Sequence, residues 1–274
     1  MKITKANVFS TSKLTSILTL GVGLIAGNAE AVGPTSTLYL TAGDQGQNLR
    51  VLGGTTTAIV SAQANPAGNG EYAIAVSGGT IRTGGNGQFG APAVGSTYDL
   101  NFNYTGPQLA NPLNEVLDGT TDGNYNYGAN WLTGAIYRYN LDWTSPAPIF
   151  NVPTGQTYLG ISYDPFNNSL WVANGVSITD YTMGGGQLSS FNTSAERALA
   201  FDGADGTLWA LNGGGTGIFD QYSTSGVLLQ TMNIHNSDNI IGGEFALVSV
   251  PEPTTLALAG LGGLASLVTF CRRK

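Results

Sequence analysis

A repeat of about 38 residues constrains the fold of this chain most strongly. Asp164 and Asp202 are 38 residues apart. Trp171 and Trp209 have the same separation. Each unit contains an apolar strand, an Asp-led turn, a strand with Leu-Trp, a Gly-rich connection, a strand with Tyr and a closing strand. Short strands separated by turn residues at a fixed period predict a repeat architecture built from small sheets.

Three weaker copies precede these two units. They cover residues 118–152, residues 71–109 and, as a degenerate copy, residues 36–62. Four short strands per roughly 40 residues are typical of a β-propeller blade. A lone four-stranded sheet cannot bury both of its faces, whereas blades stacked around an axis bury them and leave only short edges.

The sequence therefore predicts an all-β chain with a β-propeller of about five to six four-stranded blades. We expect the stretch "GGEFALVSV", near Phe245, to close the ring by pairing with a strand near residues 38–40. The stretches "LWVAN" and "LWALN" resemble NHL or YVTN-type propeller repeats, which implies the same fold. A β-sandwich uses the same kind of strands and remains the alternative.

Residues 1–31 have the three zones of a secretory signal peptide. Basic residues come first, a mainly apolar core covers residues 14–27, and Ala29 and Ala31 stand at A-x-A spacing. This pattern predicts export through the Sec pathway and cleavage after Ala31. A retained membrane anchor is the alternative, but the apolar core is short and interrupted by Thr and Ser. The domain that follows covers residues 32–249.

Residues 250–274 form a second address segment. An uncharged run covers residues 254–270, and at 1.5 Å per residue its 17 residues span about 25 Å, enough for a short transmembrane helix. Arg272 and Arg273 follow at once. The positive-inside rule places this basic end in the cytoplasm and residues 32–249 outside.

The order of Pro251, Glu252 and Pro253, then the apolar run, then Arg272 and Arg273 resembles a PEP-CTERM sorting signal. That resemblance implies an exported bacterial protein, anchored transiently in the inner membrane and processed by exosortase. It also implies a cell-envelope or extracellular location linked to biofilm or exopolysaccharide. The prolines hold the segment extended, which suits the binding groove of a protease. A rigid spacer before a plain tail anchor is the alternative.

The charge of the middle region excludes some classes of protein. Residues 32–250 contain four basic and fifteen acidic residues, a formal net charge of −11. Such a surface repels phosphate, so we expect no nucleic-acid partner. The only cysteine, Cys271, excludes an intramolecular disulfide framework. The only histidine, His235, lies in a polar stretch and argues against a Ser-His-Asp triad or a zinc site.

Carboxylates are the only abundant reactive groups. The weak calcium candidates lie in the stretches "DGTTDG", "DPFNNS" and "DGADG": Asp118, Asp122, Asp164, Asp202 and Asp205. None follows the EF-hand pattern. Asp followed by Gly also caps turns, because Asp accepts backbone N–H bonds and Gly tolerates positive φ. We favour turns, and expect no cofactor apart from the possibility of calcium.

The aromatic side chains divide into two groups. Trp171 and Trp209 recur in phase inside apolar strands, which predicts blade core. The stretch "NYNYGANW" departs from the repeat and is interpreted as a loop insert. Its Tyr125, Tyr127 and Trp131 are the candidate ligand surface.

These observations favour a non-enzymatic binding or structural protein of the cell surface or matrix. Its expected partners are exosortase during sorting, the membrane before processing, and exopolysaccharide or surface proteins. The alternative is a secreted propeller hydrolase or lyase that acts on polysaccharide through Asp and Glu. Carboxylates that converge on the mouth of the axis would favour the enzyme. A lining of Gly, Asn and Thr would favour the binding protein.

Overall fold

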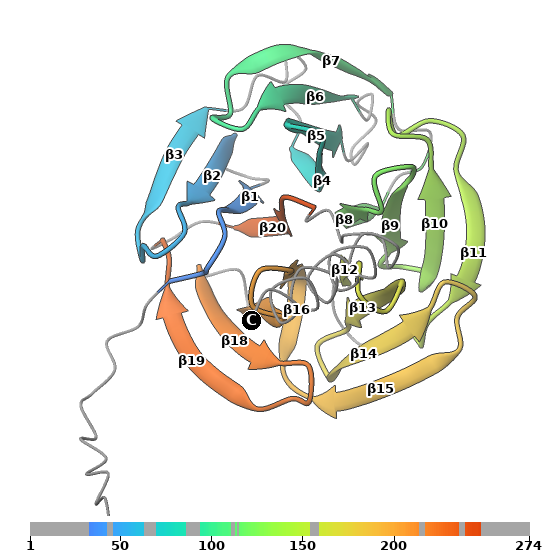
Figure 1. The fold of residues 1–274 in the computed structure, drawn as a ribbon. Coiled ribbons are helices and arrows are strands. Elements are labelled where there is room, and N and C mark those ends of the chain that lie inside the picture. Colours follow the sequence, from blue (N-terminus) through green and yellow to red (C-terminus); the bar gives the residue numbers. More distant parts are fainter. Residues whose placement is uncertain are drawn as a thin grey trace, which may run out of the picture. The chain divides into compact units, whose positions relative to one another are not determined.

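The structure is a computed structural model that describes residues 33–42, 46–62, 70–85, 94–110, 113, 115–153, 159–213, 217–235 and 239–247. Every regular element in these ranges is a β-strand, and the strands form five four-stranded antiparallel sheets. The sheets stand as blades around a central axis (Figure 1). The predicted β-propeller is confirmed with five blades, and the sandwich alternative is wrong.

We label the blades A to E and give the strands of each from the axis outwards. Blade A contains β20 (Ile240–Phe245), β1 (Leu38–Ala42), β2 (Gln47–Val51) and β3 (Ala58–Ala62). Blade B contains β4 (Glu71–Ser77), β5 (Thr80–Gly85), β6 (Val94–Asp99) and β7 (Tyr104–Ala110). Blade C contains β8 (Val116–Thr121), β9 (Asn126–Asn130), β10 (Ala135–Tyr139) and β11 (Ala147–Asn151). Blade D contains β12 (Gly160–Asp164), β13 (Ser169–Ala173), β14 (Ser177–Thr182) and β15 (Gln187–Asn192). Blade E contains β16 (Ala195–Asp202), β17 (Thr207–Asn212), β18 (Ile218–Ser223) and β19 (Leu228–Asn233).

Blade A closes the ring with strands from both ends of the described chain. The last strand, β20, pairs antiparallel with the first strand, β1. Leu38 lies opposite Phe245, and Leu40 lies opposite Gly243. The predicted closure is therefore confirmed, and this ladder joins the two ends of the described chain in one blade.

A separate hydrophobic cluster fills each of the five contacts between neighbouring blades. Trp171 of β13 packs in the cluster between blades D and E. Trp209 of β17 packs in the cluster between blades E and A. Both side chains are almost completely buried, so the predicted core role of these two residues is confirmed.

The contact between blades B and C is filled differently, because the second strand of blade B, β5, contains no tryptophan. Trp143 comes instead from the turn between β10 and β11, where it adopts a φ of 62° and is fully buried. Its indole Nε1 donates to the carbonyl of Arg82 in blade B at 3.4 Å. Gly119 provides the space, since a Cβ there would lie 2.4 Å from the indole ring.

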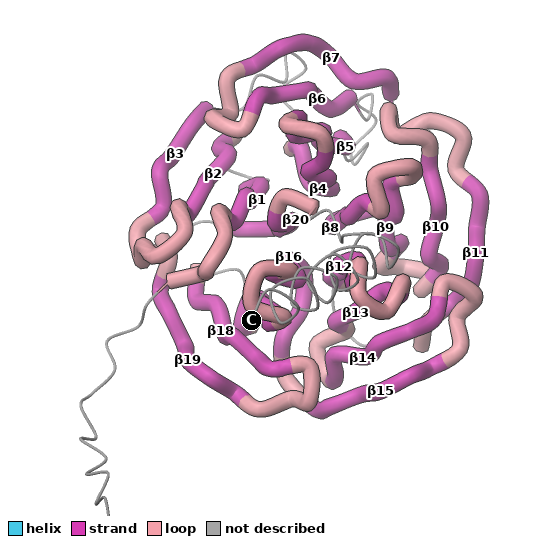
Figure 2. The backbone as a smooth tube through the Cα atoms, in the orientation of Figure 1, coloured by secondary structure: helices cyan, strands magenta, loops and turns pink. Residues whose placement is uncertain are grey.

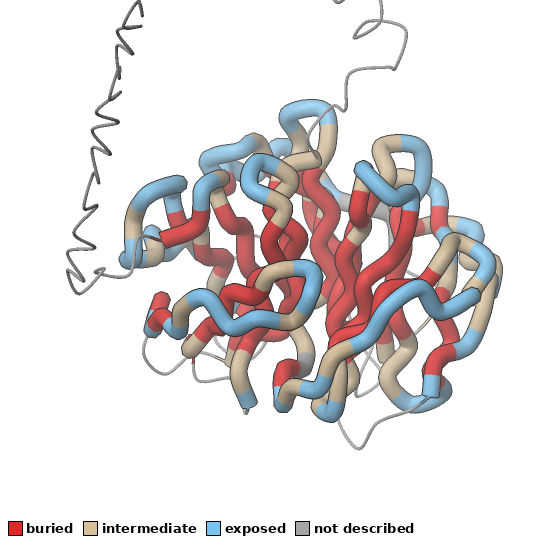
Figure 3. Tube along the Cα trace, turned by 60° about the horizontal axis from the view of Figure 1, so that its bottom comes forward, coloured by how far each residue is buried: buried red, intermediate tan, exposed pale blue. Residues whose placement is uncertain are grey.

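The backbone trace shows strands joined by turns at both ends of each blade (Figure 2). Burial is greatest in the strands near the axis, while the turns and outer strands are more exposed (Figure 3). The tightest hairpin joins β4 to β5, where Ser77 lies opposite Thr80. Gly78 and Gly79 make this two-residue turn at φ values of 57° and 75°. Two consecutive left-handed residues match the twist of a hairpin and favour glycine at both positions.

Candidate functional site

The innermost strands β4, β8, β12, β16 and β20 end together at one end of the axis. A small pocket there is lined by residues at or just beyond the ends of four of them, Thr121, Pro165, Gly203 and Phe245. Leu247 lines the same pocket, and its N–H donates to a carbonyl near the end of β4 at 3.1 Å. We call this end of the propeller the tail face, because Leu247 is the last described residue. The other end is the opposite face.

Asp118 of β8 accepts hydrogen bonds from the innermost strands of several blades at the axis. Its Oδ1 accepts the N–H groups of Gly119 at 2.9 Å and Gly243 at 3.0 Å. Its Oδ2 accepts the N–H groups of Ile161 and Leu199, both at 3.0 Å. One carboxylate in blade C therefore binds the innermost strands of blades A, D and E.

This arrangement solves a problem inherent in a propeller. The innermost strand is one edge of its sheet, so its unpaired N–H groups point towards the axis and require partners there. Glycines let the strands approach closely. A Cβ on Gly242 would lie 3.3 Å from Asp118 Oδ1, and a Cβ on Gly160 would lie 1.6 Å from the carbonyl oxygen of Arg197. A central acceptor and small neighbours thus satisfy the backbone of a narrow axis.

Hydroxyl groups join neighbouring innermost strands in the same way. Thr120 Oγ1 accepts the N–H of Tyr163 at 2.9 Å, which links blades C and D. Ser162 Oγ accepts the N–H of Phe201 at 2.9 Å, which links blades D and E. Thr41 Oγ1, on the second strand of blade A, accepts the N–H of Gly242 of β20 at 3.1 Å and donates to the carbonyl of Tyr72 in blade B at 2.5 Å.

Glu244 of β20 is the second carboxylate at the axis. Its Oε1 accepts the N–H of Phe245 at 3.0 Å and the hydroxyl of Ser162 at 3.5 Å. Its Oε2 is buried and has no hydrogen-bond partner in the described part of the chain. Burial raises the pKa of Glu244 well above its ordinary value, and the negative charge of Asp118 raises it further.

Burial also raises the pKa of Asp118 well above its ordinary value, and its backbone N–H bonds oppose that rise. Because four N–H donors surround Asp118, they favour its charged form over that of Glu244.

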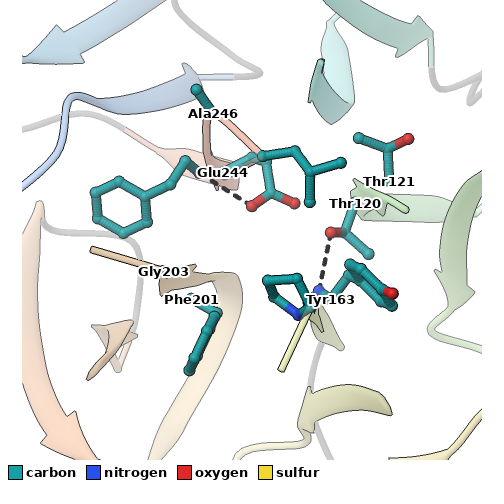
Figure 4. A pocket seen from close by; sticks show the side chains of 10 residues that line it. Thr120, Thr121, Tyr163, Phe201, Gly203, Glu244 and Ala246 are labelled. Carbon is teal, nitrogen blue, oxygen red and sulfur yellow. Dashed lines mark hydrogen bonds between the residues drawn. The ribbon is translucent and has the colours of Figure 1, made fainter. Parts of the chain in front are cut away.

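The pocket above Glu244 is small and partly apolar (Figure 4). Thr120, Tyr163 and Phe201 also line it. Its volume of about 10 Å³ has room for no more than about one water molecule. A glycosidase needs two carboxyl groups that face a substrate across a cleft. Here both oxygens of Asp118 are taken by backbone N–H groups, so the pair is arranged as a structural element.

The other Asp candidates lie in a turn of the tail face or end the strand before it, and they accept backbone N–H bonds of these turns: Asp122, Asp164, Asp202 and Asp205. The turn interpretation is confirmed for these four. It is wrong for Asp118, which is buried in a strand at the axis. No group of three or more His, Cys, Asp or Glu side chains suited to a metal ion occurs within the described ranges. Calcium binding by these turns stays a prediction.

Two of these turns also hold the beginning of the described chain. Asp202 accepts the N–H of Ser36 at 2.8 Å and its hydroxyl at 2.7 Å. Asp205 accepts the hydroxyl of Thr35 at 2.6 Å. The first and last described segments therefore both lie at the tail face, and the opposite face carries neither.

The three aromatic candidates do not form one surface. The predicted loop insert is wrong, because residues 126–130 are strand β9 of a regular blade. Tyr125 precedes β9 at the tail face, where the Arg138 guanidinium lies 4.5 Å from its ring centre. Tyr127 is buried and donates to Asp122 at 2.7 Å. Trp131 follows β9 at the opposite face, and its Nε1 donates to Glu115 Oε2 at 2.6 Å.

His235 follows β19 in the connection to β20, at the opposite face and away from the pocket.

Two predictions fall outside the described residues: the cleavage site at Ala29 and Ala31, and the sorting signal with its apolar run. Within the described residues, no helix is long and apolar enough to cross a membrane.

A family model described as the PEP-CTERM protein-sorting motif matches residues 249–274. The predicted sorting motif is thereby confirmed, and it implies export, transient membrane anchoring and processing by exosortase. No curated protein matches the chain.

The chain matches several solved structures. A chain in the crystal structure of a nidogen/laminin complex has a TM-score of 0.54 at 14% identity, covering 78% of this chain and 100% of that chain. This similarity shows the fold alone. A protein of unknown function from Bacteroides caccae has a TM-score of 0.44 at 13% identity, covering 73% of each chain. A functionally unknown protein from Desulfotomaculum acetoxidans has a TM-score of 0.49 at 10% identity, covering 77% of this chain and 88% of that chain.

Proposed function

We propose that this protein is a non-enzymatic component of the bacterial cell surface or extracellular matrix that binds exopolysaccharide. The sorting motif at residues 249–274 carries the proposal, because it delivers the propeller to the outside of the cell. Export through the Sec pathway and a cytoplasmic C-terminus before processing complete the proposed route. A role in biofilm follows from the same delivery.

The chemistry of the axis supports a binding role over a catalytic one. Both oxygens of Asp118 are occupied by backbone N–H groups of four residues. Glu244 is buried beneath a pocket that has no room for a sugar ring. Polysaccharide hydrolysis would need both groups at an open cleft.

The net charge of the domain indicates which class of glycan it binds. Residues 32–250 have a formal net charge of −11, from four basic and fifteen acidic residues. Long-range repulsion disfavours polymers rich in uronic acids and favours neutral or amino-bearing glycans.

Trp131 supports a glycan-binding surface on the opposite face. Its ring is partly buried against the core between blades C and D, and its Nε1 is hydrogen-bonded to Glu115. The next residue, Leu132, is exposed. A fixed aromatic ring loses little conformational entropy when a sugar stacks on it.

The test is retention of the mature domain on an array of neutral, amino-bearing and uronic-acid glycans. We expect retention on neutral or amino-bearing glycans that is lost with Trp131→Ala. Tyr125→Ala is the matched control, because it removes an aromatic ring from the tail face. Retention only on uronic-acid glycans, retention on none, or shortening of a glycan during incubation would contradict the proposal. Shortening would support the hydrolase or lyase alternative.

A further inference from the structure

Every blade presents one large apolar side chain in the turns of the tail face. These side chains, in the order of blades A to E, are Leu52, Leu100, Tyr125, Phe166 and Val227. Their exposed fractions are 39%, 36%, 38%, 56% and 58%. Each turn joins a strand that runs towards the tail face to one that runs away from it. Leu52, Leu100 and Val227 lie in turns between the two outer strands of their blades, and Tyr125 and Phe166 lie in turns between the two inner strands. We call these five side chains, one from each blade around the axis, the apolar ring.

The chain leaves the propeller inside this ring. Leu247 lines the mouth, the Pro-Glu-Pro motif begins four residues later, and the uncharged run begins at Thr254. Seven residues extend at most about 25 Å, at 3.3–3.6 Å per residue. When the uncharged run is anchored in a membrane, the tail face cannot be farther than this from the point where the run enters.

We propose that the tail face lies on the outer surface of the lipid bilayer while the sorting tail is anchored, with the apolar ring in contact with the lipid. Apolar and aromatic side chains are favoured at the membrane interface. Five such side chains bind weakly on their own, but the anchor makes their encounter with the bilayer intramolecular and raises its effective concentration.

The charge of the tail face determines which lipid headgroups permit its contact with the bilayer. Residues 32–250 contain no lysine. The carboxylates at the turns of this face, Asp99, Asp122, Asp142 and Asp205, outnumber its two arginines, Arg50 and Arg138. Anionic lipid therefore weakens the contact, whereas zwitterionic lipid permits it. The inference rests on the membrane anchoring that the sorting motif implies and not on glycan binding. In this orientation Trp131 and the opposite face point away from the bilayer.

Two valines provide a matched pair of positions for the test. Val227 at the tail face and Val176 at the opposite face have exposed fractions of 58% and 59%. Because Cys271 is the only cysteine, Val227→Cys and Val176→Cys in a Cys271→Ser background each give a single labelling site in the full chain. Each is labelled with a polarity-sensitive fluorophore and reconstituted in phosphatidylcholine vesicles that contain a doxyl-labelled lipid. Only protein that floats with the vesicles is measured, so every molecule counted is anchored.

We expect the probe at position 227 to be quenched and shifted to shorter emission wavelengths, and the probe at position 176 to be unaffected. The shift at position 227 should decrease when phosphatidylglycerol is added. It should also decrease when Leu52, Leu100, Tyr125 and Phe166 are all replaced by Ser. Equal quenching at the two positions, or stronger quenching at position 176, overturns the proposed orientation. An unchanged signal in the fourfold Ser variant overturns the proposed contact. Neither result bears on glycan retention, which is measured with the mature domain and no membrane.

Discussion

Replacing Asp118 by Asn tests the proposed role of this residue at the axis. The amide has nearly the same shape as the carboxylate but places an NH₂ group where one oxygen was. Each carboxylate oxygen of Asp118 accepts two N–H groups, at 2.9 and 3.0 Å for Oδ1 and at 3.0 Å for both bonds of Oδ2. In either orientation of the amide, two buried N–H donors therefore lose their acceptor.

Each unpaired buried donor costs about 1–3 kcal/mol, so Asp118→Asn should lower the free energy of unfolding by about 2–6 kcal/mol. Removing a buried charge offsets part of this loss, and we expect a net loss of about 2–4 kcal/mol. For a domain of this size that corresponds to a decrease in Tm of roughly 4–16 °C.

The assay is urea and thermal unfolding of the mature domain, followed by tryptophan fluorescence. Asp205→Asn is the control, because that side chain also accepts N–H and O–H bonds but lies exposed in a turn. We expect a loss of about 0.5–1 kcal/mol for the control. If Asp118→Asn destabilises the domain no more than Asp205→Asn does, the axial role assigned to Asp118 is refuted.

Four further predictions concern the pH dependence, the core, the axis and calcium. Because the folded-state pKa of Glu244 is raised, its contribution to stability is fully present below its unfolded pKa and is lost as the pH rises through the folded value. Glu244→Gln should therefore flatten the decline of Tm with pH, and parallel profiles for the variant and the wild type would contradict this. Trp209→Ala should cost about 3–5 kcal/mol in urea unfolding, because the side chain is completely buried between blades E and A; a cost below about 1 kcal/mol would argue against the core role. Gly119→Ala should cost about 1–3 kcal/mol, because its Cβ would lie 2.4 Å from the indole of Trp143, and combining it with Trp143→Phe should recover part of that loss. A chelator should leave Tm unchanged, because Asp164 and the other turn carboxylates already accept backbone N–H bonds; a lower Tm would instead favour calcium binding.

The repeat made the blades predictable because it is a local pattern. Asp164 and Trp171 have the same spacing as Asp202 and Trp209, so the two units contain the same order of strands. The weaker copies contain this order too. The ring closure was predictable because an apolar strand near Phe245 had no other partner in its own repeat.

The role of Asp118 was not predictable from the sequence, because three of its four hydrogen-bond partners come from other blades. The signal available was its position in an apolar strand, "VLDGTT", rather than at a turn. Glu244 likewise stands inside an apolar strand, "IIGGEF".

The candidate ligand surface failed as a single platform for a different reason. Alternation along β9 buries Tyr127, and the length of the strand separates Tyr125 from Trp131 at the two faces of the propeller. A cluster of aromatic residues in the sequence does not show which face each side chain occupies until the strand is recognised.

We propose that two address segments, residues 1–31 and 250–274, deliver the five-bladed propeller to the outside of the cell and are then removed. Intact mass spectrometry of the protein recovered from a host that contains exosortase tests this most directly. We predict a chain that begins after Ala31 and lacks the apolar run of residues 254–270. A mass that retains this run would contradict the account, since the tail would then be a permanent anchor and not a sorting signal.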